Sequence, residues 1–595
     1  MIRSGPALGM TVVLSLLAGC SSAPPAKPDS SKGDPAALTV VAEIALERGD
    51  CKAASESYAK AAQVGAASLA RRATHVALAC EHLPAAWESA TRWRQLAPKS
   101  LEANAMYAAV AVKLYRLADA RAAINDFSHA PMPAKQPGAG EEGSGDSDED
   151  ADPSAGTPGK GGVGVRGESA IGLTALTALL LEQSDAPTVL AAMSSTLETA
   201  SAPEALSLLS ELALSGYDAQ RAERYAQQAL DRNPRDFGAK RVLARAYVIT
   251  GDAAKAIATA REAMREDPEH STFDLVEVLT ALDRVEDAHQ ELERLRSAHV
   301  PAPEVDRRLA MLAFEAGDMK EAQQRFTELL ASGDGSESAM LYLADIAARD
   351  GDTDAAIAGY RRLYDSSVAL PARSRAAALL LARGDRKEAL TLLDDYVSDH
   401  PESEFDMTLT KAHLLADHGE ADAGLELLSS ALERHPRHPS IEYDRAVILE
   451  QAGRVHDSVE ALQHLLAERA DDPTLLNALG YTLADHNLEL PHAETFIRRA
   501  LNVMPDNPAA LDSLGWVRFR QGDSKTAVVT LERAYYISHD SEIAAHWGEA
   551  LWASGDRSQA RKVWAAALAR EPDSPQLKAT LARFLPDANR SPSEH

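Results

Sequence analysis

Two short stretches of the sequence hold residue types that could bind ions or phosphate. Asp146, Asp148 and Asp150 alternate as carboxylates do at the start of a calcium-binding loop. Such a loop needs glycine at its sixth position and glutamate at its twelfth, where this chain has Ala151 and Thr157. The stretch GTPGKGG holds a lysine as phosphate loops do, but it lacks their first glycine and their final serine or threonine. We interpret both stretches as parts of a solvated acidic linker.

The histidines do not form a catalytic pattern either. The closest pair, in RHPRHPS at residues 434 to 440, falls where a turn between helices is expected, and histidines in a turn are more often solvated than metal-bound. The sequence has no His-Glu-x-x-His, Gly-x-Ser-x-Gly or Cys-x-x-Cys motif. We therefore expect no catalytic residue, no metal site and no cofactor, and we do not predict an enzyme.

Cys20 closes a short apolar segment that follows a positively charged start. This layout is typical of an export signal, and the segment is too short to span a bilayer. The residues LAGC at 17 to 20 resemble the lipobox of bacterial lipoproteins, whose cysteine carries diacylglycerol and becomes the new N-terminus. The resemblance implies lipidation at Cys20, and the two serines that follow resemble the signal for sorting to the outer membrane, on its periplasmic side in a Gram-negative bacterium. The alternative is an ordinary secretory signal with an unmodified cysteine.

The overall charge narrows the class of partner. Lysine and arginine number 61 against 89 acidic residues, a formal net charge of −28. Such a chain is poorly suited to nucleic acid, because phosphate binding needs clustered cations. Adhesion to anionic lipid is equally disfavoured, so a lipid anchor would have to hold the protein at the membrane. Basic protein partners suit the charge.

A regular repeat sets the architecture. A glycine that is usually followed by an aspartate recurs about every 34 residues, as at Gly317, Gly351 and Gly384. The glycine can end one helix in the left-handed conformation, and the aspartate that usually follows can cap the next helix. An alanine a few residues later lets two helices approach closely, and a proline often closes the repeat.

This pattern resembles the tetratricopeptide repeat, a hairpin of two helices. The stretch FGAKRVLARAYVITGDAAKAIATAREAMREDP, residues 237 to 268, matches that family almost throughout. The resemblance implies an all-α helical solenoid, a right-handed superhelix in two arrays separated by a disordered acidic linker. The alternative is an unrelated helical bundle with alanine-rich packing.

The expected organisation follows from the repeat positions. It comprises a signal peptide at 1–19, a flexible tether at 20–34, an N-terminal array at 35–130, the linker at 131–167, a degenerate hairpin at 168–202, a C-terminal array at 203–575, and a capping helix and tail at 576–595.

Cys51 and Cys80 are brought together by the repeat register. Cys51 should open the second helix of the first hairpin, and Cys80 should close the first helix of the next. Because consecutive helices run antiparallel, the two ends should lie side by side, and an exported protein can keep a disulfide. The sequence is compatible with a Cys51–Cys80 disulfide or with two separate buried thiols.

The remaining candidate site is a protein-binding groove on the first helices of the C-terminal repeats. Aromatic and hydrogen-bonding residues suit protein recognition there, although several could simply pack against the adjacent helix. The predicted groove residues are Tyr443, Asn477, Tyr481, Asp512, Trp516, Arg520, Glu549 and Trp552.

Residues 477 to 523 add a finer resemblance. They carry Asn-Ala-Leu-Gly-Tyr and Asp-Ser-Leu-Gly-Trp in successive repeats, as do proteobacterial lipoproteins that bind and activate a periplasmic carboxyl-terminal processing protease. The resemblance implies an envelope adaptor that brings this protease to its substrates, the peptidoglycan hydrolases. Two alternatives are a scaffold for assembling a secretin, pilus or polysaccharide exporter, and a cell-wall enzyme or its carbohydrate-binding subunit.

Overall fold

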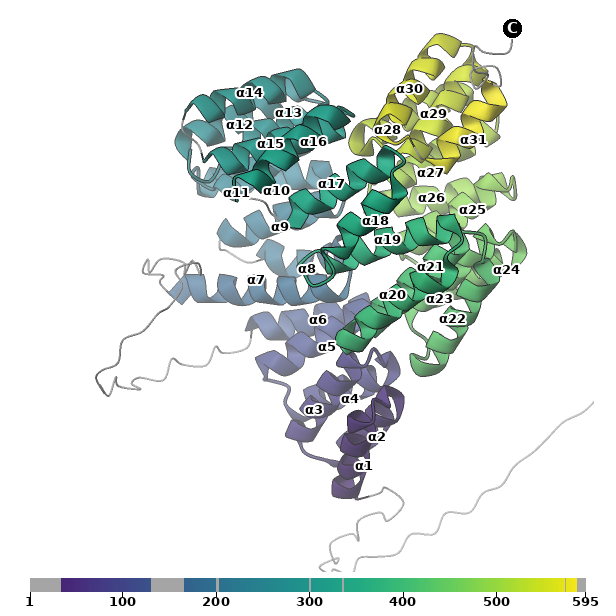
Figure 1. Ribbon diagram of the computed structural model, residues 1–595. Coiled ribbons are helices and arrows are strands. Elements are labelled where there is room, and N and C mark those ends of the chain that lie inside the picture. Colours follow the sequence, from purple (N-terminus) through teal and green to yellow (C-terminus); the bar gives the residue numbers. More distant parts are fainter. Residues whose placement is uncertain are drawn as a thin grey trace, which may run out of the picture.

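The computed structural model describes residues 34–129, 165–199, 203–298, 301–333, 337–572 and 574–585. Every regular element in these ranges is a helix. The helices pair into fifteen successive antiparallel hairpins, three before the predicted linker, one directly after it and eleven beyond, followed by a single helix. The predicted all-α solenoid is confirmed (Figure 1).

The helices before residue 300 are α1 (Pro35–Glu47), α2 (Cys51–Val64), α3 (Ala67–Ala79), α4 (Leu83–Leu96), α5 (Leu101–Lys113), α6 (Leu117–His129), α7 (Val165–Gln183), α8 (Ala186–Thr199), α9 (Pro203–Ser215), α10 (Ala219–Arg232), α11 (Phe237–Ile249), α12 (Ala253–Glu266), α13 (Asp274–Ala281) and α14 (Val285–Ser297).

The helices after residue 300 are α15 (Ala302–Glu315), α16 (Met319–Ala331), α17 (Glu337–Arg349), α18 (Thr353–Arg361), α19 (Ala369–Arg383), α20 (Arg386–Asp399), the 3-10 turn η1 (Pro401–Ser403), α21 (Glu404–Asp417), α22 (Ala421–Arg434), α23 (Pro439–Gln451), α24 (Val455–Glu468), α25 (Pro473–Asp485), α26 (Leu490–Val503), α27 (Pro508–Arg520), α28 (Ser524–Ser538), α29 (Ser541–Ser554), α30 (Arg557–Arg570) and α31 (Pro575–Phe584).

The turns that contain a Gly-Asp pair have the chemistry that this pair predicts. The glycine has a positive φ, for example 84° at Gly251. This backbone conformation is costly for any residue with a side chain. The aspartate then caps the next helix, as when Asp252 accepts a hydrogen bond from the backbone N–H of Lys255. Asp385 is the exception, because its carboxylate pairs with Arg383 instead of the helix end.

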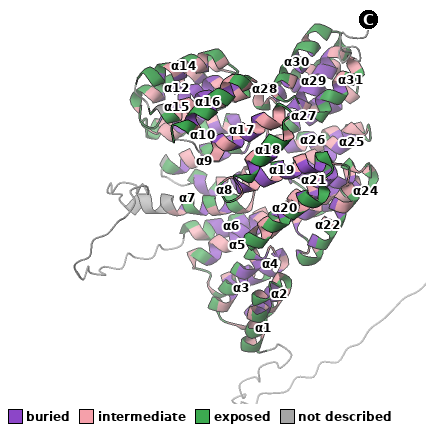
Figure 2. Ribbon diagram, in the orientation of Figure 1, coloured by how far each residue is buried: buried purple, intermediate pink, exposed green. Residues whose placement is uncertain are grey.

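The alanine that follows each of these turns is fully buried between the two helices of its hairpin. The set is Ala54, Ala256, Ala322, Ala356, Ala389, Ala527 and Ala560. A larger side chain at such a position would overpack the hairpin by about 1 to 3 kcal/mol. Figure 2 shows the resulting pattern, in which buried residues face neighbouring helices and exposed residues face outward.

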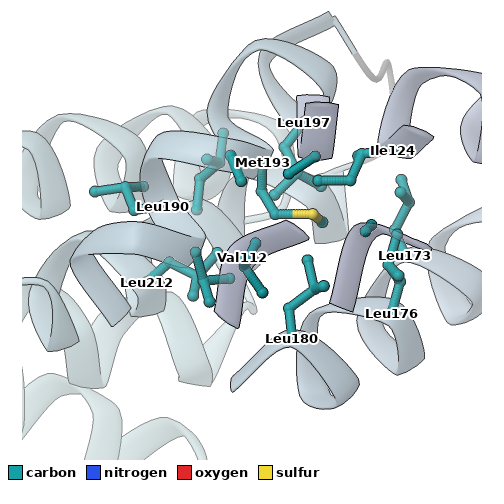
Figure 3. Packing of buried hydrophobic residues seen from close by; sticks show 14 of the residues in the cluster. Val112, Ile124, Leu173, Leu176, Leu180, Leu190, Met193, Leu197 and Leu212 are labelled. Atoms are coloured by element: carbon teal, nitrogen blue, oxygen red, sulfur yellow. The ribbon is translucent and has the colours of Figure 1, made fainter. Parts of the chain in front are cut away.

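The α7–α8 hairpin joins the two arrays into one continuous stack. It begins three residues earlier than predicted, at Val165, and the rest of the predicted linker lies outside the described residues. Leu180 of α7 and Met193 of α8 belong to one apolar cluster with Val112 of α5 and Leu212 of α9. Figure 3 shows these side chains filling the space between the helices. The linker therefore interrupts the sequence without interrupting the core.

The stack curves until its C-terminal half lies beside its N-terminal half (Figure 1). The backbone carbonyl of Cys80 is 3.1 Å from Nδ1 of His435, and the backbone N–H of Asp506 donates to the carbonyl of Tyr217 at 2.9 Å. We call this line of contacts the seam. The seam closes the superhelix, because it joins the two halves of the stack to each other. The repeat pattern alone did not predict these contacts.

Helix α31, which lies where the sequence places the capping helix, covers the end of the stack. Leu577 is fully buried, and Ser574 caps the helix by accepting from the backbone N–H of Leu577. A solenoid needs such a terminal element because its last hairpin would otherwise expose an apolar face.

Candidate protein-binding surface

The predicted groove residues all lie on the first helices of their hairpins. Helix α25 contacts α27, α27 contacts α29, and α23 shares an apolar cluster with α25, so these helices form one layer, which we call the inner layer. Its predicted residues are Tyr443 on α23, Asn477 and Tyr481 on α25, Asp512, Trp516 and Arg520 on α27, and Glu549 and Trp552 on α29.

Trp516 is the centre of a polar and aromatic network in this layer. Its ring stacks on His546 of the next repeat, with ring centroids 4.0 Å apart, and its Nε1–H donates to Asp485 of the preceding repeat at 3.0 Å. Nδ1 of His546 lies 3.0 Å from both carboxylate oxygens of Asp512. Burial acts to lower the pKa of His546, but the Asp512 carboxylate outweighs it and raises that pKa.

Tyr481 extends the network across two repeats. Its hydroxyl donates to Glu542 at 2.6 Å, and burial together with that carboxylate raises the pKa of the tyrosine. Burial also raises the pKa of Glu542. Nearby on α25, the side-chain carbonyl oxygen of Asn477 is buried without a partner in the described structure. A buried acceptor without a donor costs free energy, which a hydrogen bond to this atom would recover.

Side chains at the C-terminal end of the layer are more tightly engaged. Glu549 is buried and accepts from Arg583 and Thr580, both on the capping helix. Trp552 packs against Trp564, and the guanidinium of Arg557 lies 5.0 Å from its ring centre. These contacts stabilise the end of the stack and leave little of the two side chains for a partner.

Half-buried residues are therefore the best candidates for contact with a partner. Arg520 lies over the Trp516 ring at 5.6 Å, and Tyr443, Asn477 and Tyr481 are also only partly buried. Asp512 and Trp516 are 5% exposed and act mainly by holding the layer together.

Glycines in the inner layer explain part of the Leu-Gly-Tyr and Leu-Gly-Trp motifs. A Cβ on Gly480 would lie 2.5 Å from Ile497, and one on Gly515 would lie 2.5 Å from Leu531, so each glycine permits close contact with the second helix of its hairpin. The following aromatic residue then belongs to the network. The motifs thus combine a glycine that permits close helix packing with an aromatic residue of the network.

The seam uses a set of residues that the sequence pattern did not reveal. Five intra-repeat turns have a non-glycine residue with positive φ where the other repeats mostly have glycine. Four of them contact the C-terminal half: Glu81 pairs with His438 at 3.1 Å, the Tyr115 hydroxyl donates to the Asp471 carbonyl at 2.6 Å, the Tyr217 carbonyl accepts from Asp506, and Asp283 pairs with Arg570 at 2.5 Å. The signal in the sequence was the break in the glycine period.

One group of described residues has the types and spacing of metal ligands. Ligand atoms of Glu450, Asp485 and His486 lie within 4.8 Å of one another. His486 is 2.7 Å from Glu450, and Asp485 accepts from Trp516, so hydrogen bonds inside the protein account for the cluster. It carries no metal assignment.

The three cysteines divide into a described pair and one outside the described residues. The structure joins Cys51, at the start of α2, to Cys80, at the end of α3, in a disulfide with Cα atoms 5.3 Å apart. Cys20, the predicted lipidation site, lies outside the described residues. Among the helices that are described, none has the length and apolarity needed to cross a membrane.

Comparison with known proteins identifies the repeats. A family model described as tetratricopeptide repeat matches residues 208–271, 307–371, 409–473 and 547–591, and a second with the same description matches 372–403. The chain thus contains tetratricopeptide repeats, which are protein-interaction scaffolds, over these ranges. In one relative, the TPR repeat-containing protein PA4667 of Pseudomonas aeruginosa, 213 residues align at 31% identity, covering 36% of each chain. The match therefore spans about a third of that protein.

Two solved structures are also among the matches. The thermophilic TPR protein TTC0263 of Thermus thermophilus is 23% identical, with 30% of this chain and 96% of that chain covered and a TM-score of 0.28. A chain of the APC/C hetero-tetramer Cut9-Hcn1 is 16% identical, with 93% and 96% covered and a TM-score of 0.29.

Proposed function

We propose that this tetratricopeptide-repeat chain is an adaptor of the bacterial envelope, which holds protein partners against the inner layer of its C-terminal repeats. The observation that carries the proposal is the row of half-buried aromatic and polar side chains on α23, α25 and α27, including an unpartnered buried carbonyl oxygen at Asn477. Surfaces that combine aromatic rings, arginine and unsatisfied hydrogen-bonding atoms suit protein recognition.

The partner that we propose is a periplasmic carboxyl-terminal processing protease, with peptidoglycan hydrolases as its substrates. The resemblance of residues 477 to 523 to lipoprotein adaptors of such proteases supports this choice. We further propose attachment to the outer membrane through lipid on Cys20, facing the periplasm. An anchor would raise the effective concentration of protease and substrate at the cell wall.

Affinity capture from native envelopes, followed by mass spectrometry, tests the adaptor. Trp516→Ala is unsuitable because deleting a buried tryptophan costs about 3 to 5 kcal/mol and would damage the repeat. We would use Tyr481→Phe combined with Arg520→Ala. These substitutions remove the Tyr481 hydroxyl and the Arg520 guanidinium but keep the aromatic ring at 481 and the Trp516 ring in place. Lys525→Ala, an exposed cation on α28, is the matched control.

Recovery of the protease with the wild type and the control, but not with the double variant, supports the proposal. Recovery of secretin, pilus or polysaccharide-export components instead would replace the protease adaptor by an assembly scaffold. Metabolic labelling with radioactive palmitate tests the anchor separately, since Cys20→Ser should abolish the label. A label that persists in this variant would contradict lipidation at Cys20.

A further inference from the structure

A cavity of about 540 Å³ opens on the seam. Its wall combines the Glu81 turn and the ends of α5 and α7 from the N-terminal half with α21, α23 and the start of α25 from the C-terminal half. Because both halves contribute, the cavity exists only while the seam is closed.

The wall of the cavity is strongly acidic. It holds six carboxylates and two permanent cations. Lys113 pairs with Glu81 at 2.8 Å and Arg469 pairs with Asp472 at 3.1 Å, so both cations are already engaged. The other four carboxylates have no lysine or arginine partner in this wall, and they are Glu182, Asp185, Asp406 and Asp444.

Two of these four have partners of other kinds. Asp444 is 3.3 Å from His413, and Asp185 accepts from the backbone N–H of Thr188. Neither partner is a permanent positive charge. Tyr443 is another lining residue. Burial and the negative charges of Asp444 and Asp472 raise the pKa of its hydroxyl.

His438 adds a buried polar atom that lacks a partner. The residue is 1% exposed, it lines the cavity, and its Nδ1 has no hydrogen bond. Its other nitrogen, Nε2, lies 3.1 Å from Glu81. Burial alone would raise the pKa of Glu81, but His438 and Lys113 lower it below its usual value, so this group is an ionised acceptor. Burial lowers the pKa of His438 itself.

These protonation states decide what Nδ1 can do. A neutral imidazole that donates from Nε2 to a carboxylate carries a lone pair on Nδ1. The His438 side chain that lines the cavity therefore carries an unused acceptor, and the same wall holds four carboxylates that lack a cationic partner. Phe405, whose ring lies 4.5 Å from that of His438, adds an apolar wall that suits a hydrocarbon stem.

We propose that this cavity binds a cationic side chain, arginine in particular, from a protein partner. An arginine supplies a positive charge, up to five N–H donors and an apolar stem, which match the carboxylates, the His438 lone pair and the aromatic wall. The inference rests on the proposed scaffold function and specifies its partner, which presents an exposed basic segment to the seam.

Saturation-transfer NMR with two small probes tests the inference on the full chain. The probes are Nα-acetyl-arginine amide and Nα-acetyl-citrulline amide, which have nearly the same shape but differ in charge. We expect the arginine probe to bind about tenfold more tightly, because hydrogen bonds between charged groups are roughly twice as strong as neutral ones.

The variant Asp185→Asn combined with Asp406→Asn removes one charge from each side of the cavity. An asparagine at 185 keeps the oxygen that caps Thr188, and Asp406 is exposed, so the fold should be retained. We expect the arginine probe to bind about tenfold more weakly to this variant. Asp422→Asn, an exposed acid in the first turn of α22, is the control and should bind as the wild type does.

Equal binding of the two probes, no binding of either at millimolar concentration, or unchanged binding to the double variant would each overturn the inference. The capture experiment gives an independent result. If protease capture depends on Tyr481 and Arg520, the adaptor proposal is supported even when the arginine probe does not bind. If the arginine probe binds but no protease is captured, the cavity proposal is supported and the adaptor proposal is not.

Discussion

Replacing Glu81 by glycine should weaken the seam while relaxing the turn in which the residue lies. Glu81 has a φ of 49°, a left-handed conformation that costs a residue with a side chain about 1 kcal/mol relative to glycine. If the residue served only its own repeat, Glu81→Gly would stabilise that repeat, because glycine is what most other repeats have there.

The long-range contacts predict the opposite sign. The variant removes the carboxylate that pairs with His438, whose side chain is 2% exposed, and it leaves Lys113 with only the Gln183 side-chain oxygen, 3.4 Å away, as a partner. An unpaired buried donor costs about 1 to 3 kcal/mol, and the lost lysine pair adds to this. After subtracting the gain in the turn, we expect the closed state to lose about 1 to 2 kcal/mol, or about tenfold in the equilibrium for opening.

Hydrogen exchange followed by mass spectrometry measures this opening locally. Peptides covering residues 434–445, on the C-terminal side of the seam, should exchange about tenfold faster in Glu81→Gly. Asn487→Gly is the matched control, because Asn487 also has a positive φ, 56°, but makes none of the seam contacts described. Unchanged or slower exchange over 434–445 in Glu81→Gly would refute the role assigned to this contact.

Three other results are expected. Thiol counting should find Cys51 and Cys80 blocked before reduction and free afterwards, and reduction should destabilise the first two hairpins by about 3 to 4 kcal/mol; two free thiols in the untreated protein would contradict the pairing. His546 has a raised pKa through Asp512, so its contribution to stability should be complete below its unfolded pKa of about 6.5 and lost as pH rises through the higher folded pKa. Thermal melts of the wild type and His546→Gln across that range check the sign. Gly548→Ala should destabilise the α29–α30 hairpin by at least about 1 to 3 kcal/mol, since its Cβ would lie 2.0 Å from a tryptophan indole.

A second glycine supplies the control for Gly548. Gly238, in the first turn of α11, has only ordinary or slightly close contacts around its hypothetical Cβ, the nearest atom being 3.4 Å away. Alanine there should be neutral or should stabilise the helix by up to about 1 kcal/mol. Equal destabilisation by the two substitutions would contradict the packing argument, because helix propensity favours alanine over glycine at both positions.

Much of the fold could be predicted from the sequence because the same local interactions recur in many repeats. The left-handed glycine, the aspartate cap and the small buried alanine each depend on contacts inside one hairpin. The exception at Asp385, where Arg383 competes for the carboxylate, arises from a single neighbouring residue. Interactions of this kind can be predicted without any knowledge of distant contacts.

The candidate site was only partly predictable because its contacts run between repeats. The predicted residues lie on the first helices, but their partners His546, Asp485 and Arg583 were missed. Asp512 and His546 are one repeat period apart, so reading polar pairs at that spacing would have found this contact. The seam was harder, since Glu81 and His438 are separated by 357 residues and only the curvature of the whole stack brings them together.

The closed seam also fixes how many repeats the chain can have. An open solenoid can gain or lose a hairpin at little cost, because each repeat contacts only its neighbours. Here, four turns in the first half meet junctions between repeats in the second half. Deleting a single hairpin between residues 337 and 400 would shift every later junction away from its turn. Repeat number, which is usually free to drift in such proteins, becomes a property on which the whole molecule depends.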